Sequence, residues 1–142
     1  MRKLVILRWL PASGKSTEAK KLVEEGMKRV NKDLLREMLD FWVWSKANEA
    51  LVNEIEYDLI QSLLSRGISV VVDDTNISMS RVNLLEAIWM WEDATIEVML
   101  IETPVEECIK RDANREKSVW EEVIKKFSKQ LWTQMTNKQL QL

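Results

Sequence analysis

The stretch from Trp9 to Ser16 carries most of a motif that binds phosphate groups. The motif reads Gly-x4-Gly-Lys-Ser/Thr, and Gly14, Lys15 and Ser16 match its second half, whereas Trp9 stands in place of its first glycine. In such a loop, successive backbone N–H groups and a helix N-terminus form a concave anion site. Lys15 would reach the β- and γ-phosphates of ATP, and the Ser16 hydroxyl would bind Mg²⁺. The alternative is a helix that begins by chance with Gly-Lys-Ser-Thr, but the strand predicted before the run favours the phosphate loop.

Carboxylates and arginines follow the loop in positions that suit phosphoryl transfer. The chain has no histidine, so a proton acceptor must be a carboxylate or a lysine, and Asp33 is the candidate base. Arginines such as Arg36 supply the forked, permanent positive charge that phosphoryl groups require. Asp74 ends a buried strand, where a charge is costly unless it is used. Structural alternatives remain: a helix charge in the first turn for Asp33, a solvated helix charge for Arg36, and a surface pair for Arg111 and Arg115.

Short apolar runs alternate with amphipathic stretches along the chain. Strands are expected at residues 3–8, 28–30, 69–72 and 95–101. Helices are expected from residue 15 to before Gly26, at 32–39, between Ser45 and Gly67, at 80–91, from Thr103-Pro104, and from a Ser118/Glu121 capping box to Met135. For the long helix after Ser45, the spacing predicts a buried face formed by Ala47, Leu51, Ile55, Leu59 and Leu63.

The alternation of strands and helices predicts an α/β fold with three layers. Consecutive right-handed βαβ units would build a parallel sheet of four to five strands, flanked by helices on both faces. Ligands of such sheets bind beyond the carboxyl ends of the strands, and the motifs above fall at those ends. Residues 1–135 are expected to form the domain, and residues 136–142 a flexible tail.

The composition of the chain excludes several classes of protein. The 142 residues suit one domain, and the net charge of −2 argues against broad, non-specific coating of nucleic acid. Cys108 is the one cysteine, so no internal disulfide can form, and a reducing cytoplasm is the expected compartment. The N-terminal apolar run is too short to cross a membrane, and no membrane association is expected.

The chain resembles the kinase domain of phage-type polynucleotide 5′-kinases over residues 1–135. Four short motifs in the expected order carry the resemblance: Leu-Pro-Ala-Ser-Gly-Lys-Ser-Thr at 10–17, Asn-Lys-Asp-x-x-Arg at 31–36, Asp-Asp-Thr-Asn at 73–76, and Lys-Arg-Asp-Ala-Asn-Arg at 110–115. The resemblance implies a P-loop kinase fold, ATP and Mg²⁺ as cofactors, and a 5′-hydroxyl end of nucleic acid, or another small hydroxyl compound, as the acceptor.

The resemblance also implies a role for each matching residue. Asp33 would take the proton of the acceptor hydroxyl, Arg36 would hold the acceptor's phosphate, and Asp74 with Thr75 would orient the acceptor. Arg111 and Arg115 would lie on a lid over the donor phosphates, with Arg115 and Lys15 acting in catalysis. The residues expected to bind the nucleotide are Ser13, Gly14, Lys15, Ser16, Thr17, Arg111 and Arg115, and Ser16 is the expected metal ligand.

Seven tryptophans accompany only three glycines, and several lie where small or polar residues are expected. Trp9 would crowd the phosphate loop, because glycine at this position allows a tight exit from the strand, and a side chain in glycine-only geometry costs about 1–2 kcal/mol. Trp132 is expected to be either a core residue or incidentally exposed, and not part of a binding surface. An exposed aromatic surface would also be expected around the phosphate site, formed by Trp9, Leu10, Phe41, Trp42 and Trp44.

Two functions are compatible with these features. The first is an ATP-dependent kinase, in which aromatic side chains would stack the bases of the acceptor. The second is a catalytically impaired scaffold that arose by divergence or by deliberate redesign, and that binds a protein partner or a second copy of itself through the aromatic surface. Weak ATP binding would favour the second hypothesis.

Overall fold

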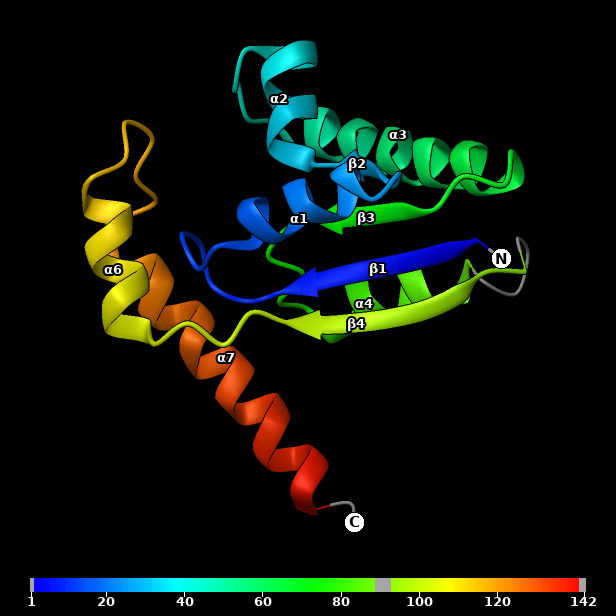
Figure 1. Ribbon diagram of the computed structural model, residues 1–142. Coiled ribbons are helices and arrows are strands. Elements are labelled where there is room, and N and C mark those ends of the chain that lie inside the picture. Colours follow the sequence, from blue (N-terminus) through cyan, green and yellow to red (C-terminus); the bar gives the residue numbers. More distant parts are fainter. Residues whose placement is uncertain (1, 89–92, 141–142) are drawn as a thin grey trace.

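The computed structural model describes residues 2–88 and 93–140, and its strands and helices alternate along the chain (Figure 1). The elements are β1 (Lys3–Arg8), α1 (Lys15–Glu24), β2 (Lys28–Val30), α2 (Lys32–Asp40), α3 (Lys46–Ser65), β3 (Val70–Asp73), α4 (Met79–Ala87), β4 (Thr95–Leu100), α6 (Val105–Ala113) and α7 (Glu121–Leu140). None of the described helices is long and apolar enough to cross a lipid bilayer.

The four strands form one sheet in the order β2-β3-β1-β4, and all three pairings are parallel. Leu4 of β1, for example, lies opposite Val70 of β3 and Ile96 of β4. Parallel neighbours that are far apart in sequence need crossover helices, which cover both faces of the sheet. The predicted α/β fold of the P-loop kinase type, with a parallel sheet of four to five strands, is confirmed.

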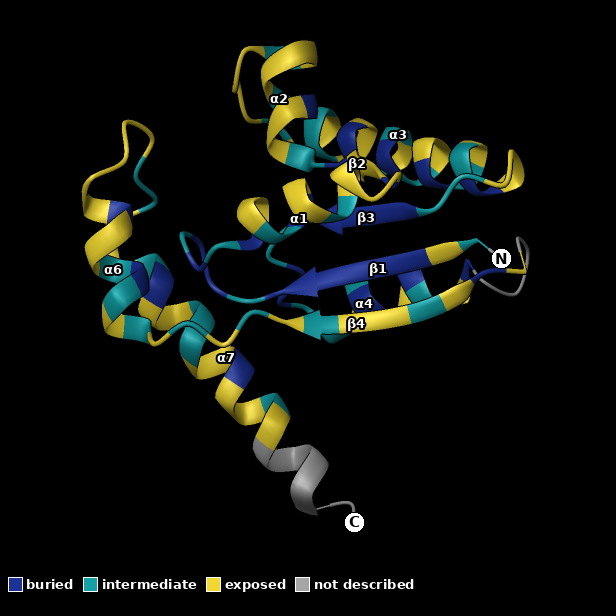
Figure 2. Cartoon of the chain, viewed as in Figure 1, coloured by how far each residue is buried: buried dark blue, intermediate teal, exposed yellow. Residues whose placement is uncertain are grey.

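Alternate residues of β1 serve two separate cores, as the side-chain period of a strand requires. One face packs Leu4 and Ile6 against Ile60 and Leu64 of α3 and Leu85 of α4. The opposite face packs Val5 and Leu7 against the α1 side, where the partners are Ala19, Leu22 and Met27. Figure 2 shows β1 and β3 as buried and β4 as the more exposed edge strand. The sheet is therefore anchored on both sides directly behind the loops at its carboxyl edge.

A third core lies beyond the sheet and contradicts one prediction. Leu10 is fully buried among Ile77, Cys108 and two residues of α7, Ile124 and Leu131. The expectation that Leu10 is an exposed partner-binding residue is therefore wrong. Periodicity could not reveal this burial, because the residues that cover Leu10 follow it in the chain by 67 or more positions.

The predicted elements exist, and their bounds differ in places. β1 and β2 match the prediction, and α3 begins after its N-cap Ser45, whose side chain accepts a hydrogen bond from the backbone of Asn48. The buried face of α3 is one residue out of phase with the prediction: it consists of Val52, Glu56, Ile60 and Leu64, whereas Leu51 and Leu59 are exposed.

The last helices also depart from expectation. α4 ends at Ala87, and the rest of the helix predicted to residue 91 falls largely on residues 89–92, outside the described part of the chain. α7 begins at Glu121 and continues to Leu140, past the predicted end at Met135. Trp132 lies on its exposed side, which is one of the two positions expected for it.

Candidate functional site

A cavity of about 1040 Å³ lies beyond the carboxyl ends of the strands. Its wall combines the phosphate loop from Pro11 to Thr17, the start of α2, the segment after β3, the start of α4, and residues of α6 and α7. Figure 1 shows that the arrowheads of β1 and β4 point toward the side on which α6 and α7 lie. The sequence motifs, which are far apart in the chain, therefore meet at one site, as the rule for parallel sheets requires.

The phosphate loop has the backbone conformation of an anion-binding turn. Ala12 and Gly14 both have positive φ angles, 61° and 107°, and Ser13 lies between them. Alternation of this kind turns successive N–H groups toward one concavity, and α1 begins directly afterwards at Lys15. Glycine is favoured at position 14 because a side chain is strained at its φ angle of 107°.

Lys15 closes this concavity. Its Nζ donates hydrogen bonds to the backbone oxygens of Trp9 and Leu10, at 3.1 and 2.6 Å, and to Ser13 Oγ at 3.3 Å. Burial lowers the pKa of Lys15 to about 8, and the nearby Asp73 carboxylate opposes that decrease. A buried ammonium group that is held by neutral oxygens is in position to exchange them for the oxygens of an anionic ligand.

Ser16 and Asp73 meet at the mouth of the loop, and their chemistry suits Mg²⁺. Ser16 Oγ donates a hydrogen bond to Asp73 Oδ2 at 3.2 Å, and Arg29 Nε donates to the same oxygen at 2.6 Å. Magnesium prefers oxygen ligands and binds through one or two carboxylates together with substrate phosphates. Because a hydroxyl and a carboxylate oxygen lie side by side next to the phosphate loop, the residues present fit such an ion.

The start of α2 holds the candidate base in a network of ion pairs. Arg36 Nη1 donates to Asp33 Oδ1 at 2.7 Å, and the other side of the guanidinium binds Glu49 of α3 through Nε at 3.0 Å and Nη2 at 2.6 Å. Glu49 raises the pKa of Arg36, and Arg36 in turn lowers the pKa of Glu49. Asp33 and Arg36 line the cavity together, as predicted, and Glu49 fixes them from behind.

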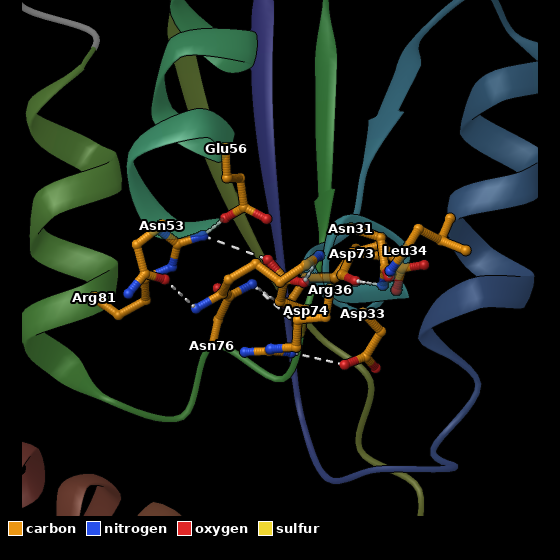
Figure 3. A network of polar contacts seen from close by, with 12 residues as sticks. Asn31, Asp33, Leu34, Arg36, Asn53, Glu56, Asp73, Asp74, Asn76 and Arg81 are labelled. Atoms are coloured by element: carbon orange, nitrogen blue, oxygen red, sulfur yellow. Dashed lines mark hydrogen bonds and ion pairs between the residues drawn. The ribbon is translucent and has the colours of Figure 1, made fainter. Parts of the chain in front are cut away.

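The Asp74 side chain is 8% exposed and lines the same cavity. Burial raises its pKa to about 6, although the backbone N–H of Lys32 donates to Oδ1 at 2.8 Å. Thr75 lines the cavity as well, and its backbone oxygen accepts a hydrogen bond from the backbone N–H of Trp9. Figure 3 shows Asp74 between the α2 residues Asp33 and Arg36 and the side chain of Arg81. The predicted acceptor residues therefore share one wall.

Arg111 lies in α6 and Arg115 lies two residues after the end of that helix, and both side chains line the cavity. Arg111 Nη1 donates to the backbone oxygen of Ser13 at 3.4 Å, and Arg115 lies 3.6 Å from the buried carboxylate of Asp112. Asp112 also accepts hydrogen bonds from Ser118 Oγ and from the backbone N–H groups of Val119 and Trp120. Ser118 therefore does not cap α7 as predicted. It helps to fold the loop after α6 back onto α6.

This loop contacts α2 and the segment that follows it. Lys117 Nζ lies 4.2 Å from the centre of the Trp42 ring and 3.9 Å from Glu37 Oε1. The cation–π contact and the ion pair together connect the loop after α6 to α2 and to the segment that follows α2.

The expected aromatic surface divides into two separate parts. Trp9 is half-buried and packs against the third core, where its Nε1 donates to the backbone oxygen of Thr103 at 2.7 Å. Its φ angle is not positive, and its side chain does not line the cavity, so the expected crowding and backbone strain at Trp9 are wrong. Phe41, Trp42 and Trp44 are exposed, at 86%, 41% and 76%. The exposed aromatic surface therefore consists of the segment after α2 alone.

Sequence reasoning missed three carboxylates that organise the site: Asp73, Glu49 and Asp112. The signal for Asp73 was available, because it ends β3 directly before Asp74. Glu49 lies in the first turn of α3, where an acidic residue is common for local reasons, so its pairing with Arg36 required the tertiary structure. Asp112 lies in the 110–115 motif, but its role depends on a turn in the following loop.

Comparison with known proteins agrees with this geometry. A family model described as an AAA domain (AAA_33) matches residues 4–136. The L-seryl-tRNA(Sec) kinase of Methanococcus maripaludis is 33% identical over 128 residues, which are 86% of this chain and 49% of that protein. The chain thus spans about half the length of this curated relative.

Solved structures show the same fold. A chain in the Pnkp1/Rnl/Hen1 RNA repair complex is 27% identical, with a TM-score of 0.86 over 96% of this chain and 46% of that chain. The Mycobacterium tuberculosis APS kinase CysC is 24% identical, with a TM-score of 0.63 over 80% of this chain and 69% of that one, and this likeness concerns the fold alone. The matched residues include the phosphate loop, Asp33, Arg36, Asp74 and α6, so the chain belongs to the AAA_33 family and has the P-loop kinase fold.

Proposed function

We propose that the chain transfers the γ-phosphate of ATP to the 5′-hydroxyl end of a nucleic acid. The observation that carries the proposal is that Asp33, held by Arg36 and Glu49, faces the same cavity as Lys15 and the phosphate loop. A base on one side of a cavity and a phosphate cradle on the other are the two parts that phosphoryl transfer to a hydroxyl needs. The similarity to a chain of an RNA repair complex over nearly the whole domain supports a polynucleotide acceptor.

Each residue has a defined part in this proposal. The amides from Ser13 to Thr17 and the Lys15 ammonium bind the donor phosphates, while Arg111 and Arg115 neutralise charge from the edge. Ser16 and Asp73 would hold Mg²⁺, which neutralises phosphate charge when it is bound. Asp33 accepts the proton of the acceptor hydroxyl as its oxygen attacks the γ-phosphorus and the bond to the β-phosphate oxygen breaks.

The test is transfer of label from γ-labelled ATP to a 5′-hydroxyl oligonucleotide. We expect transfer by the native chain and a loss of about 10²–10⁴-fold in Asp33→Asn. Asp58→Asn, which changes an exposed carboxylate of α3, is the matched control and should keep full activity. A seryl-tRNA acceptor belongs in the same experiment because of the seryl-tRNA kinase relative. Label that appears only on the seryl-tRNA would refute the 5′-hydroxyl acceptor.

We also propose that the exposed aromatic surface after α2 mediates self-association. Leu34 and Met38 are four residues apart, so they lie along one side of α2, and Phe41 follows the last residue of that helix; all three are exposed. Trp44 extends the apolar surface. A contiguous apolar surface of this kind is typical of interfaces, and a symmetric pair of α2 segments would cover it.

Analytical ultracentrifugation over a range of protein concentrations tests the second proposal. We expect a concentration-dependent dimer for the native chain and a monomer for the double variant Phe41→Ser/Trp44→Ser. Trp132→Ser, which removes an equally exposed tryptophan from α7, should leave the dimer intact. A native chain that stays monomeric at high concentration would refute self-association and would leave the kinase proposal untouched.

A further inference from the structure

Arg29 of β2 binds one of the two side chains that fit Mg²⁺, and the phosphate-transfer mechanism described above does not use it. Its Nε donates a hydrogen bond to Asp73 Oδ2 at 2.6 Å. The same oxygen accepts the hydrogen bond from Ser16 Oγ at 3.2 Å. The carboxylate oxygen that lies next to the Ser16 hydroxyl is therefore already bound to a cation of the protein.

The strand pattern explains why this arginine reaches Asp73. β2 lies at the edge of the sheet beside β3, and Arg29 is paired with Val71. Side chains alternate along a strand, so Arg29 lies on the face opposite to that of Val30, which packs in the core on the α3 side. Asp73 follows Val71 by two residues and shares the face of Arg29.

The two side chains differ in their access to the cavity. Asp73 is 2% exposed and lines the cavity, whereas the Arg29 side chain is 32% exposed and lies outside the described cavity wall. Arg29 thus binds the carboxylate from the edge of the sheet. A change of this residue should therefore alter the charge of the site without altering the residues that line the cavity.

Arg29 cancels the negative charge of Asp73. An ionised carboxylate as buried as this one needs a partner of opposite charge, and a guanidinium supplies that charge permanently. A neutralised carboxylate attracts a free divalent cation much less than a bare one, because the cation is attracted and repelled by charges that lie side by side. Within the described part of the chain, no group of three or more His, Cys, Asp or Glu side chains could hold a metal ion.

Nucleotide phosphates would change this balance. Mg²⁺ is usually bound through one or two carboxylates together with the phosphates of a substrate. Phosphates in the loop supply several negative charges and oxygen ligands, so the ion no longer depends on the charge of Asp73 alone. Affinity for the metal should then arise only when the nucleotide is present.

We propose that Arg29 makes metal binding conditional on nucleotide. By neutralising Asp73, it keeps the nucleotide-free phosphate loop from taking up a free divalent cation, so that the metal enters together with the phosphates. The inference rests on the proposed function for the location of the metal site at Ser16 and Asp73.

Electron paramagnetic resonance of Mn²⁺ without nucleotide tests this role, because it reports the free ion and needs no catalysis. Mn²⁺ prefers the same oxygen ligands as Mg²⁺. Arg29→Gln removes the charge beside Asp73, and Arg29→Lys keeps a cation but holds it less closely. Lys28→Gln is the matched control, because it removes an exposed charge from the preceding residue of β2, on the other face of the sheet. The double variant Arg29→Gln/Asp73→Asn shows whether a gain in affinity depends on Asp73.

We expect a Kd for Mn²⁺ above about 1 mM in the native chain and a Kd lower by about tenfold or more in Arg29→Gln. Arg29→Lys should show a smaller gain of about threefold, while Lys28→Gln and the double variant should bind Mn²⁺ as weakly as the native chain. A native Kd below about 1 mM would overturn the proposal, as would a gain in Arg29→Gln that survives in the double variant or is matched by Lys28→Gln.

An Arg29→Gln chain that folds and binds Mn²⁺ no more tightly than the native chain would also overturn the proposal. If Arg29→Gln does not fold, Arg29→Lys decides, and an unchanged Kd in that variant refutes the role of Arg29. Nucleotide-independent Mn²⁺ uptake by Arg29→Gln through Asp73, without transfer of label to any acceptor, would uphold this inference and refute the kinase proposal. Transfer of label with Mn²⁺ uptake that does not respond to Arg29 would do the opposite.

Discussion

Arg36 and Glu49 are joined by two nearly parallel hydrogen bonds, Nε to Oε2 at 3.0 Å and Nη2 to Oε1 at 2.6 Å, which tie α2 to α3. The remaining side of the guanidinium carries Asp33. Glu49 is thus a positioning residue that acts on the candidate base through an arginine.

Glu49→Gln tests that indirect role. We expect kcat for oligonucleotide phosphorylation to fall about tenfold. The neutral amide of glutamine offers one acceptor oxygen to the Arg36 guanidinium, which binds both carboxylate oxygens of Glu49 in the native chain. The KM for ATP should not change, since Glu49 does not line the cavity. Glu54→Gln, an exposed change on the same helix, is the control. A higher KM for ATP with unchanged kcat would contradict the positioning role.

Asp74 should make stability depend on pH in the acid range. Its pKa in the folded chain, about 6, is above the ordinary value of 3.8, so the folded state binds the proton more tightly. Its stabilising contribution is therefore fully present below pH 3.8 and is lost as pH rises through 6. Asp74→Asn should gain stability relative to the native chain between pH 4 and pH 7, by up to about 3 kcal/mol.

Urea unfolding at pH 4, 5, 6 and 7 measures this difference. Asp58→Asn, a change of the same kind on an exposed part of α3, is the control. An Asp74→Asn difference that is flat with pH would mean that folding does not change the pKa of this carboxyl.

Trp120 has a left-handed backbone conformation, which glycine adopts readily and other residues rarely adopt. Its φ angle is 74°, and its side chain is 71% exposed, so the strain of the left-handed conformation is offset by little packing. Trp120→Gly should raise the free energy of unfolding by about 0.5–1 kcal/mol, since relief of strain of about 1–2 kcal/mol exceeds the entropy cost of glycine.

Trp132→Gly is the matched control for that prediction, because Trp132 is 72% exposed within the regular helix α7. There we expect a loss of about 1 kcal/mol, as glycine is a poor helix former. Thermal unfolding of both variants distinguishes backbone geometry from the general effect of removing an exposed indole. Equal losses in the two would show that Trp120 is not strained.

Trp9→Gly should restore the first glycine of the phosphate-loop motif and yet lower the stability of the protein. The indole packs against the third core and donates a hydrogen bond to Thr103, so its removal should lower the free energy of unfolding by about 2 kcal/mol. Because the side chain lies outside the cavity, calorimetry with ATP·Mg²⁺ should show a change in affinity smaller than threefold. A tenfold increase in affinity would mean that the indole does obstruct the nucleotide.

Sequence reasoning located the site better than it located side chains. The phosphate loop, Asp33, Arg36, Asp74 and Arg111 could be placed on one cavity, because motifs at strand ends converge in any parallel sheet. The predictions from sequence were wrong where residues far away in the chain decide whether a side chain is buried. The predicted face of α3 was out of phase because Glu56, an acid, occupies the buried face and is compensated by Arg81, 25 residues later. Leu10 was misplaced for the same reason, since α6 and α7 cover it.

Lys117 links the loop after α6 to α2 and to the segment that follows α2, and this link is weak. An exposed cation–π contact and a surface ion pair at 3.9 Å are each worth no more than about 1 kcal/mol, so thermal motion breaks both often. We therefore expect the loop after α6 to separate from α2 and return to it at little cost in free energy.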